Sequence, residues 1–286
     1  MGRRGLSCTG RGREDYAGAV QPDGYPRIDA SVAHPARIYD YWLGGRDNFA
    51  ADRAAGDRVI EIRPEIIAGV RANRRFLGRA VRYLVEQQGI RQFLDIGTGL
   101  PSADNTHEVA QASAPDARIV YVDNDPIVLA HARALLIGTS PGSTEYVSAD
   151  LREVDRILAS AGETLDLSQP VALMFLMTLQ YVPDAEDPHA IVGRYLDALA
   201  SGSFLVLSDT TIEGQDELLT ESARRMNEGM AGRTTQTRRS QADLLRFFDR
   251  LSLVEPGLVT LDHWHPGPDE SPALDIPAHC ALGRKP

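Results

Sequence analysis

Lysine is almost absent from this sequence of 286 residues. Of the 30 basic residues only Lys285 is a lysine, and it is the penultimate residue. Schiff-base catalysis, a lysine general base and a phosphate-binding P-loop all need an interior lysine, so these three mechanisms are excluded. The other basic residues are arginines. Together with the abundant alanine and glycine, they indicate GC-rich coding more than a physical requirement.

Cysteine is scarce as well. Cys8 and Cys280 lie at opposite ends of the chain, which rules out a disulfide framework and the spacing of a zinc knuckle. His263 and His265 would share one face of a predicted strand, as metal ligands do. No carboxylate or second cysteine completes a ligand set close by, so we favour a surface strand and expect no metal site.

Long apolar runs are missing too. The longest covers residues 171–177, far short of the ~20 residues that a membrane-spanning helix needs. The arginines near the N-terminus are followed by no apolar stretch, so no secretory signal is predicted. We therefore expect a cytoplasmic protein with no membrane partner.

The charge balance is acidic, with a formal net charge of −10. Proteins that bind nucleic acid through its phosphates usually present a basic face. This chain has only local clusters, such as Arg233, Arg238 and Arg239, which fit either an anionic substrate or an ordinary charged loop. The composition thus argues against a nucleic-acid partner and favours a small-molecule substrate. It does not set the oligomeric state.

Hydrophobic periodicity divides the chain into three parts. Residues 1–30 are rich in glycine, arginine and proline, and are predicted to be a disordered tail. Residues 31–90 carry apolar residues three and four positions apart, which predicts a helical lid. Residues 91–286 alternate between short apolar strands and helices, which predicts an α/β doubly wound sheet. We expect residues 31–286 to form a single domain.

The expected core can be written as residue ranges. The predicted strands are 92–96, 118–122, 144–147, 171–176, 203–207, 251–264 and 277–283. The first of the predicted helices runs from about 101 to 112, and the others cover 127–136, 191–199, 215–230 and 241–248.

Acidic residues stand at the carboxyl ends of the first three predicted strands, where open α/β sheets bind ligands. Asp95 ends the first strand and is followed by Gly97 and Gly99. The two glycines let the backbone approach a ligand, and the next helix would point its N-terminus at a carboxylate or phosphate. Asp123 ends the second strand, where it can bind both hydroxyls of a ribose. Asp150 ends the third, where it can accept from an adenine amino group.

Simpler explanations fit each of these features alone. The two glycines can form nothing more than a tight turn, and Asp123 or Asp150 can cap a helix. Their combination favours a nucleotide site. A nicotinamide-dependent oxidoreductase would carry glycine where this chain has Ser102, and would not need Asp95.

The order acid–x–Gly–x–Gly resembles motif one of class I S-adenosylmethionine-dependent methyltransferases, with Pro101 in place of the third glycine. A longer resemblance concerns a family of bacterial S-adenosyl methyltransferases that is common in actinomycetes and whose substrates are largely uncharacterised. It covers about residues 33–284. It rests on ARIYDYWLGGRDNF at 36–49, ANRRFL at 72–77, FLDIGTGLPS at 93–102 and EPGLV at 255–259.

The resemblance implies a Rossmann-like class I fold with a helical N-terminal extension and an antiparallel last strand near 277–283. It implies S-adenosylmethionine as the cofactor and direct SN2 transfer of its methyl group to an unidentified acceptor. The residues that would bind the cofactor are Asp95, Gly97, Thr98, Gly99, Asp123, Asn124, Asp150 and Leu151. The candidates for the acceptor pocket or lid are Tyr39, Tyr41 and Asn48, which otherwise only pack a helix on the edge of the sheet. Arg74 is a further candidate, which either pairs with the methionine carboxylate or lies on a solvated helix face.

One departure from the family follows the fourth predicted strand. Relatives carry Leu-His before a Pro-Asp pair, whereas this chain has Gln180 in place of an imidazole that could act as a base. Either this chain works differently or that histidine is only structural. The competing function is therefore a regulatory protein that binds the cofactor without catalysis. No general base can be named from the sequence.

Overall fold

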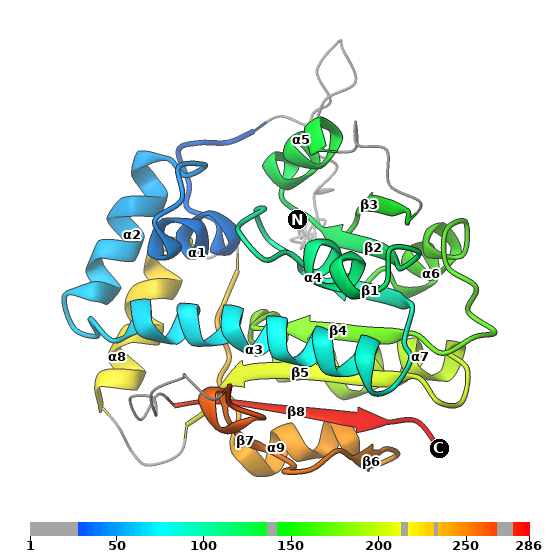
Figure 1. Ribbon diagram of the computed structural model, residues 1–286. Helices are drawn as coiled ribbons and strands as arrows, with labels where there is room; N and C mark the ends of the chain where they lie inside the picture. Colours follow the sequence, from blue (N-terminus) through cyan, green and yellow to red (C-terminus); the bar gives the residue numbers. More distant parts are fainter. Residues whose placement is uncertain (1–27, 136–141, 213–216, 232–233, 268–276) are drawn as a thin grey trace, which may run out of the picture.

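The computed structural model describes residues 28–135, 142–212, 217–231, 234–267 and 277–286 (Figure 1). The strands are β1 (Gln92–Ile96), β2 (Arg118–Asp123), β3 (Thr144–Ser148), β4 (Ala172–Leu176), β5 (Phe204–Thr210), β6 (Ser252–Leu253), β7 (Val259–Thr260) and β8 (Ala278–Arg284). The α-helices are α1 (Pro35–Leu43), α2 (Ala50–Ile60), α3 (Ile66–Glu86), α4 (Thr106–Ser113), α5 (Pro126–Leu135), α6 (Val154–Ala161), α7 (Pro188–Ala198), α8 (Glu217–Gly229) and α9 (Gln241–Leu245). Short 3-10 helices are η1 (Leu179–Tyr181), η2 (Asp184–Glu186), η3 (Arg246–Phe248) and η4 (Leu261–His263).

One sheet runs through the centre in the order β3-β2-β1-β4-β5-β8-β6, and β7 pairs with β8 outside this order. The strands β1 to β5 are parallel to one another, and β8 runs antiparallel to β5. The predicted α/β sheet with an antiparallel last strand is therefore confirmed. Of the predicted tail, residues 1–27 lie outside the described part of the chain.

Helices cover both faces of the sheet. Successive residues of a strand point to opposite faces, so each central strand packs against two helical layers. In β4, Ala172 and Met174 pack with α3 and α4, whereas Leu173 and Phe175 pack with α6 and α7. Every residue from Ala172 to Phe175 is buried, as expected of a parallel strand between two helical layers.

The predicted strand at 251–264 is wrong. The structure has only the short β6 and β7 there, separated by a turn at Pro256 and Gly257, and then η4. Gly257 has a φ of 84°, which turns the chain and ends the ladder.

The predicted start of a helix near residue 101 is also wrong. α4 begins at Thr106, because Asn105 caps it together with Glu108. Ser102 donates its N–H to the Asn105 side chain, so residues 102–105 form the approach to the helix instead of its first turn.

The region predicted as a lid divides in two. α3 packs along the sheet and belongs to its helical layer. α2 packs with α8, and α1 packs with α2 and with α3, beyond the carboxyl ends of β4 and β5, on the left in Figure 1. The buried residues of this packing are Ala33, Ile38, Trp42, Ala55, Val59, Val70, Met226 and Met230. Below, "the lid" means α1, α2 and the residues that join them.

Several arginines bind pairs of main-chain carbonyl oxygens in loops. Arg37 binds Asp29 and Val32, Arg74 binds Ala103 and Asp104, Arg79 binds Leu261 and Trp264, and Arg239 binds Leu179 and Val182. A guanidinium has five N–H donors in a planar fork, which a lysine ammonium cannot imitate. At these positions the arginines have a structural role and are not only a result of coding bias.

Candidate functional site

The carboxyl ends of β1, β2 and β3 bring together the residues predicted to bind the cofactor. Asp95, in β1, faces α4 and accepts a hydrogen bond from the Thr106 hydroxyl over 2.7 Å. Burial raises the pKa of Asp95 to about 6, although this hydrogen bond and the charge of Arg74 act in the opposite direction. A buried carboxyl with unused acceptor capacity strongly favours an incoming N–H donor.

Gly97 and Gly99 shape the turn after β1. Both have a positive φ, 72° and 69°, which disfavours any Cβ. A Cβ on Gly97 would collide with Thr178 Cγ2, whereas a Cβ on Gly99 would meet no atom within 4 Å. The amides of Gly97 and Thr98 donate to Val122 O and tie the turn to β2. Gly97 is thus required by close packing, while the space beside Gly99 is open.

Asp123 closes this turn from the neighbouring strand. Its Oδ2 accepts the N–H of Gly99 over 2.8 Å, and its Oδ1 accepts the N–H of Asp125 over 2.9 Å. Burial raises the pKa of Asp123, partly offset by the charge of His34 and by these two hydrogen bonds. The carboxylate is therefore fixed in orientation at the end of β2.

Asp150 follows β3 on the same edge of the sheet. Its Oδ1 accepts hydrogen bonds from the main-chain N–H and the guanidinium of Arg152. Asn124 Nδ2 lies 3.5 Å from Asp150 Oδ2. The carbonyl oxygen of Leu151 accepts a hydrogen bond from the Tyr195 hydroxyl. The segments after β2 and β3 are thus in contact, as the prediction requires.

The two helix-cap alternatives are wrong. Asp125 stands just before α5 and its Oδ1 accepts the N–H of Ile127. Glu153 is the N-cap residue of α6. Asp123 and Asp150 therefore have no role as helix caps.

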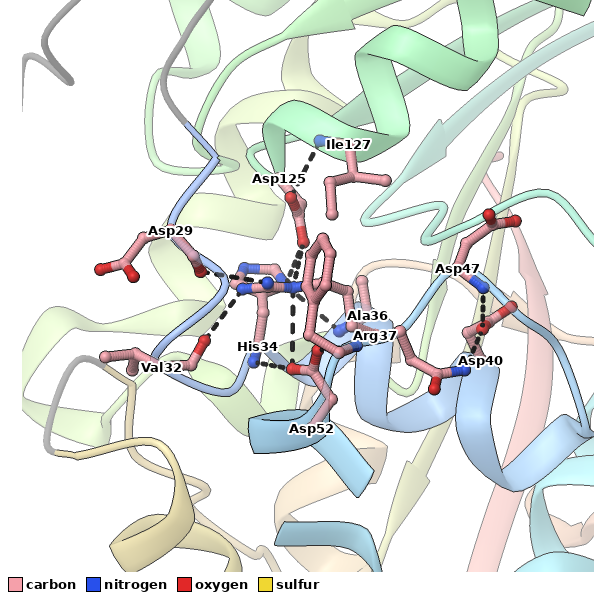
Figure 2. A network of polar contacts seen from close by, with 12 residues as sticks. Asp29, Val32, His34, Ala36, Arg37, Asp40, Asp47, Asp52, Asp125 and Ile127 are labelled. Carbon is pink, nitrogen blue, oxygen red and sulfur yellow. Dashed lines mark hydrogen bonds and ion pairs between the residues drawn. The ribbon is translucent and has the colours of Figure 1, made fainter. Parts of the chain in front are cut away.

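A buried group of charges joins the lid to the loop that carries Asp123, and Figure 2 shows it. His34 Nδ1 lies 3.0 Å and Arg37 Nε lies 3.1 Å from Asp125 Oδ2. Asp52, in the first turn of α2, accepts the N–H of His34 over 2.9 Å and lies 3.7 Å from Arg37 Nε. Arg37, Asp52 and Asp125 are each at most 5% exposed. We refer to His34, Arg37, Asp52 and Asp125 as the latch.

The latch holds Asp125 in its charged form. Burial alone would raise the pKa of Asp125, but the hydrogen bond and charge of His34 and the charge of Arg37 outweigh it, and the pKa is lowered. A second contact, between His131 Nε2 and Asp47 Oδ1 at 3.2 Å, joins the lid to α5 nearer the surface. The lid is thus attached at two points beside the predicted ribose site.

Tyr39, a candidate for the acceptor pocket, is part of a hydrogen-bond chain between elements. Its hydroxyl donates to Val70 O over 3.0 Å and accepts from Asn73 Nδ2 over 3.0 Å. Asn73 Oδ1 in turn accepts from the Ser208 hydroxyl over 2.7 Å. The chain connects α1, α3 and β5, so the polar end of Tyr39 fixes the lid to the core.

Tyr41 and Asn48 have polar ends that bind within the lid. The Tyr41 hydroxyl donates to Asp57 Oδ1 over 2.6 Å. Asn48 Nδ2 donates to Asp40 Oδ2 over 2.8 Å, and Asn48 Oδ1 accepts from Arg53. These contacts support the packing alternative for both residues.

Arg74 lies beside the turn after β1, as the cofactor hypothesis requires. Its guanidinium binds the carbonyl oxygens of Ala103 and Asp104 over 2.9 Å and 2.8 Å. Its charge lowers the pKa of Asp95 against the effect of burial. Arg74 therefore fixes the approach to α4 and adds positive charge near the turn.

Gln180 joins three segments at the carboxyl ends of β4 and β5. Its Nε2 donates to Met177 O over 2.9 Å. Its Oε1 accepts from the Thr210 hydroxyl over 2.8 Å and from Gln236 Nε2 over 2.6 Å. Its main-chain oxygen accepts the N–H of Thr237. The side chain that replaces the relatives' histidine thus has a structural role.

Asp209 is a candidate functional residue that the sequence analysis missed. It is 1% exposed and lies near the end of β5, where Thr210 donates its N–H to Asp209 Oδ1 over 2.8 Å. Among the residues that the structure describes, Oδ2 has no hydrogen-bond partner. Burial raises the pKa of Asp209 to about 7, against the main-chain hydrogen bonds of Thr210 and Gln180 and the charges of Arg239 and Arg238. The available signal was an acidic residue after an apolar strand, but the strand was predicted to end at residue 207.

His263 and His265 do not share a strand face, so that prediction is wrong. His263 ends η4 and contacts the Thr260 hydroxyl, and His265 contacts Glu255 O. Within the described ranges, no group of three His, Cys, Asp or Glu side chains is placed to hold a metal ion. No helix in those ranges has the length and apolar character to span a membrane.

Comparison with known proteins places this geometry in a family. A family model described as S-adenosyl methyltransferase matches residues 22–286. The chain belongs to the S-adenosyl methyltransferase family. This confirms the resemblance predicted from the sequence, the class I methyltransferase fold and S-adenosylmethionine as the cofactor.

Two solved structures are similar over most of this S-adenosyl methyltransferase. A DUF574 family protein from Streptomyces avermitilis is 43% identical, with a TM-score of 0.86 over 91% of this chain and 100% of that chain. A putative methyltransferase from Thermobifida fusca is 39% identical, with a TM-score of 0.83 over 90% of this chain and 96% of that chain. No curated protein matches.

Proposed function

We propose that the protein transfers the methyl group of S-adenosylmethionine directly to a small-molecule acceptor. The observation that carries this is the line of Asp95, Asp123 and Asp150 at the ends of three adjacent strands, around a turn with open space at Gly99. Adjacent strands are ~4.8 Å apart, so the strands that carry the three acids span about 10 Å across the sheet. Asp123 also lies two residues further along than Asp95, and this extended arrangement suits an elongated nucleoside.

The residues fit the parts of this cofactor. The open space beside Gly99 would receive the methionine carboxylate, with the positive charge of Arg74 nearby, and Asp95 would attract its ammonium group. Asp123 would bind the two ribose hydroxyls. Asp150 would accept from the adenine amino group, with Asn124 and Leu151 beside the ring and Thr98 in the turn.

The cofactor supplies a methyl group on a positively charged sulfur, which is already activated for attack. The protein's contribution is therefore mainly to hold the acceptor in line and to keep water out. The lid supports this role, because the latch and Tyr39 attach it beside the turn and over β5. Gln180 does not argue against turnover, because its bonds are structural.

We further propose a cytoplasmic enzyme that acts on small molecules and not on nucleic acid. The buried free thiol of Cys280 and the net charge of −10 support this.

A thermal-shift panel tests the cofactor assignment. The ligands are S-adenosylmethionine, S-adenosylhomocysteine, NAD(H) and NADP(H), each at about 100 times its Kd, where binding adds about 2.7 kcal/mol. For a chain of this length the unfolding temperature would rise by about 5–10 °C. We expect a shift with the two sulfur nucleosides alone, and its loss in Asp123→Ala. A shift with nicotinamide nucleotides only would refute the proposal.

A further inference from the structure

A buried polar cluster lies at the carboxyl ends of β4 and β5 and the amino end of β8, on the other side of β1 from Asp123. Its members are each at most 8% exposed: Thr178, Gln180, Asp209, Thr211 and His279. Polar groups are costly to bury, so a cluster of them at a ligand-binding edge of a sheet indicates a functional site.

This cluster is continuous with the turn that is proposed to bind the cofactor. The Thr178 hydroxyl donates to Ile96 O over 3.2 Å, and its methyl group leaves room for no side chain on Gly97. Gln180 follows two residues later and binds Thr210, next to Asp209. In the sheet, β5 is two strands from β1, so Asp209 lies about 10 Å from the strand of Asp95. The cluster therefore borders the proposed cofactor site on the side away from Asp123 and Asp150, which would bind the adenosine.

Within this cluster Asp209 differs from the other polar groups. Its Oδ2 is buried without a hydrogen-bond partner in the described parts of the chain. The nearby guanidinium groups have other partners: Arg239 binds Leu179 O, and Arg238 binds Leu219 O. An unsatisfied carboxyl oxygen in a dry environment favours a ligand that donates a hydrogen bond.

Tyr181 connects Asp209 to the lid. Its ring packs against the apolar cluster that the lid forms with α3 and α8. Burial raises the pKa of Tyr181, and the charge of Asp209 raises it further. The phenol is therefore neutral, and it lies close enough to Asp209 to respond to the charge of the carboxyl group.

We propose that Asp209 binds the methyl acceptor through an O–H or N–H group of the acceptor and takes its proton, with Tyr181 in the same site. This rests on the methyl-transfer function proposed above. The acceptor is then an alcohol, a phenol or an amine, and not a carboxylate, because a second negative charge would be repelled.

The step balances without a further reagent. The acceptor atom loses its proton to Asp209 Oδ2 and takes the methyl group, whose bond to sulfur breaks with both electrons remaining on sulfur. Asp209 then releases the proton to water. A carboxyl whose pKa is raised to about 7 is well suited, because both of its forms are populated near neutral pH.

Carboxyl NMR tests the proposal with simple probes. The protein, labelled with ¹³C-aspartate and saturated with S-adenosylhomocysteine, is titrated with phenol, with anisole, which has the same ring but no donor, and with benzoate. Asp209→Asn identifies the Asp209 resonance by its loss, and Asp209→Glu does so if the first variant fails to fold. We expect phenol alone to move that resonance in a saturable way.

A second measurement compares how strongly variants bind phenol, by saturation-transfer NMR. Asp209→Asn is expected to weaken phenol binding about tenfold or more, as for the loss of a hydrogen bond to a charged group. Tyr181→Phe should weaken it less, and the exposed Asp155→Asn should not change it.

The outcomes separate the two proposals. If S-adenosylhomocysteine does not bind the wild-type protein, the methyl-transfer function fails. If it binds but phenol leaves the Asp209 resonance in place, or anisole or benzoate moves it equally, the acceptor site proposed here is overturned and the cofactor site is not affected.

Discussion

The stability of the protein should depend on one buried charge in the latch, that of Asp125. In Asp125→Asn the shape and the main-chain N–H are kept, but the charge that faces His34 and Arg37 is lost. Arg37 would then face Asp52 alone, at 3.7 Å. Loss of one partner from a buried ion pair costs about 3–5 kcal/mol, because the other charge stays buried. Since Asp52 compensates in part, we expect about 3 kcal/mol.

That free energy gives a measurable shift. At this chain length each kcal/mol lowers the unfolding temperature by about 2–4 °C, so Asp125→Asn should lower it by about 6–12 °C. The lowered pKa of Asp125 sets the pH dependence. Its stabilisation is complete above the unfolded-state pKa of about 3.9 and is lost as the pH falls through the lower folded-state value. Wild type and variant should therefore converge in strong acid.

Urea unfolding followed by circular dichroism, at neutral and at acid pH, provides the assay. Asp57→Asn is the matched control, because Asp57 is an exposed lid carboxylate whose side chain accepts a hydrogen bond from the Tyr41 hydroxyl. The control should cost about 1 kcal/mol or less. Equal losses in the two variants, or a difference that persists unchanged in acid, would refute the reasoning. We also expect Asp125→Asn to weaken S-adenosylhomocysteine binding, since the loss of the charge loosens the lid from the loop that carries Asp123.

Three further predictions concern the turn and the polar cluster. Gly97→Ala should unfold at a lower temperature than Gly99→Ala and lose more affinity for S-adenosylhomocysteine in calorimetry, because only the Gly97 side chain collides; equal effects would contradict this. The raised pKa of Asp209 means that the folded protein holds the proton more tightly, so wild-type stability falls as the pH rises from about 4 to about 7. The stability of Asp209→Asn relative to wild type should therefore increase over that range in urea titrations, and a flat difference would contradict it. Gln180→Ala should cost about 2–3 kcal/mol in the same assay because three side-chain hydrogen bonds are lost; a loss below about 1 kcal/mol would show that water replaces them.

The strands that carry the site could be predicted because their apolar runs are short and bounded by polar residues. β1 was predicted at its observed limits, and Asp123 and Asp150 were found by the rule that parallel strands bind ligands at their carboxyl ends. Helix starts were harder. The helix expected near residue 101 begins at Thr106, because the local hydrogen bonds of Asn105 outweigh the general pattern.

The missed features depend on contacts between distant segments. His34 and Asp125 are separated by four helices and two strands in the sequence, and no local pattern relates them. Asp209 was missed because apolar periodicity ends at residue 207, while pairing with β8 carries β5 on to Thr210. The role of Gln180 could not be predicted either, because its partners in three segments meet only in the fold.

The arginines that bind loop carbonyls have a consequence for how this protein can diverge. Arg37, Arg74 and Arg239 hold the loops around the site through main-chain oxygen atoms, which every amino acid possesses. These contacts therefore do not depend on which side chains the contacted loop residues carry. Substitutions there can change which acceptor is admitted while the scaffold keeps its shape. Acceptor preference can in this way drift between relatives, with the cofactor turn and the sheet unchanged.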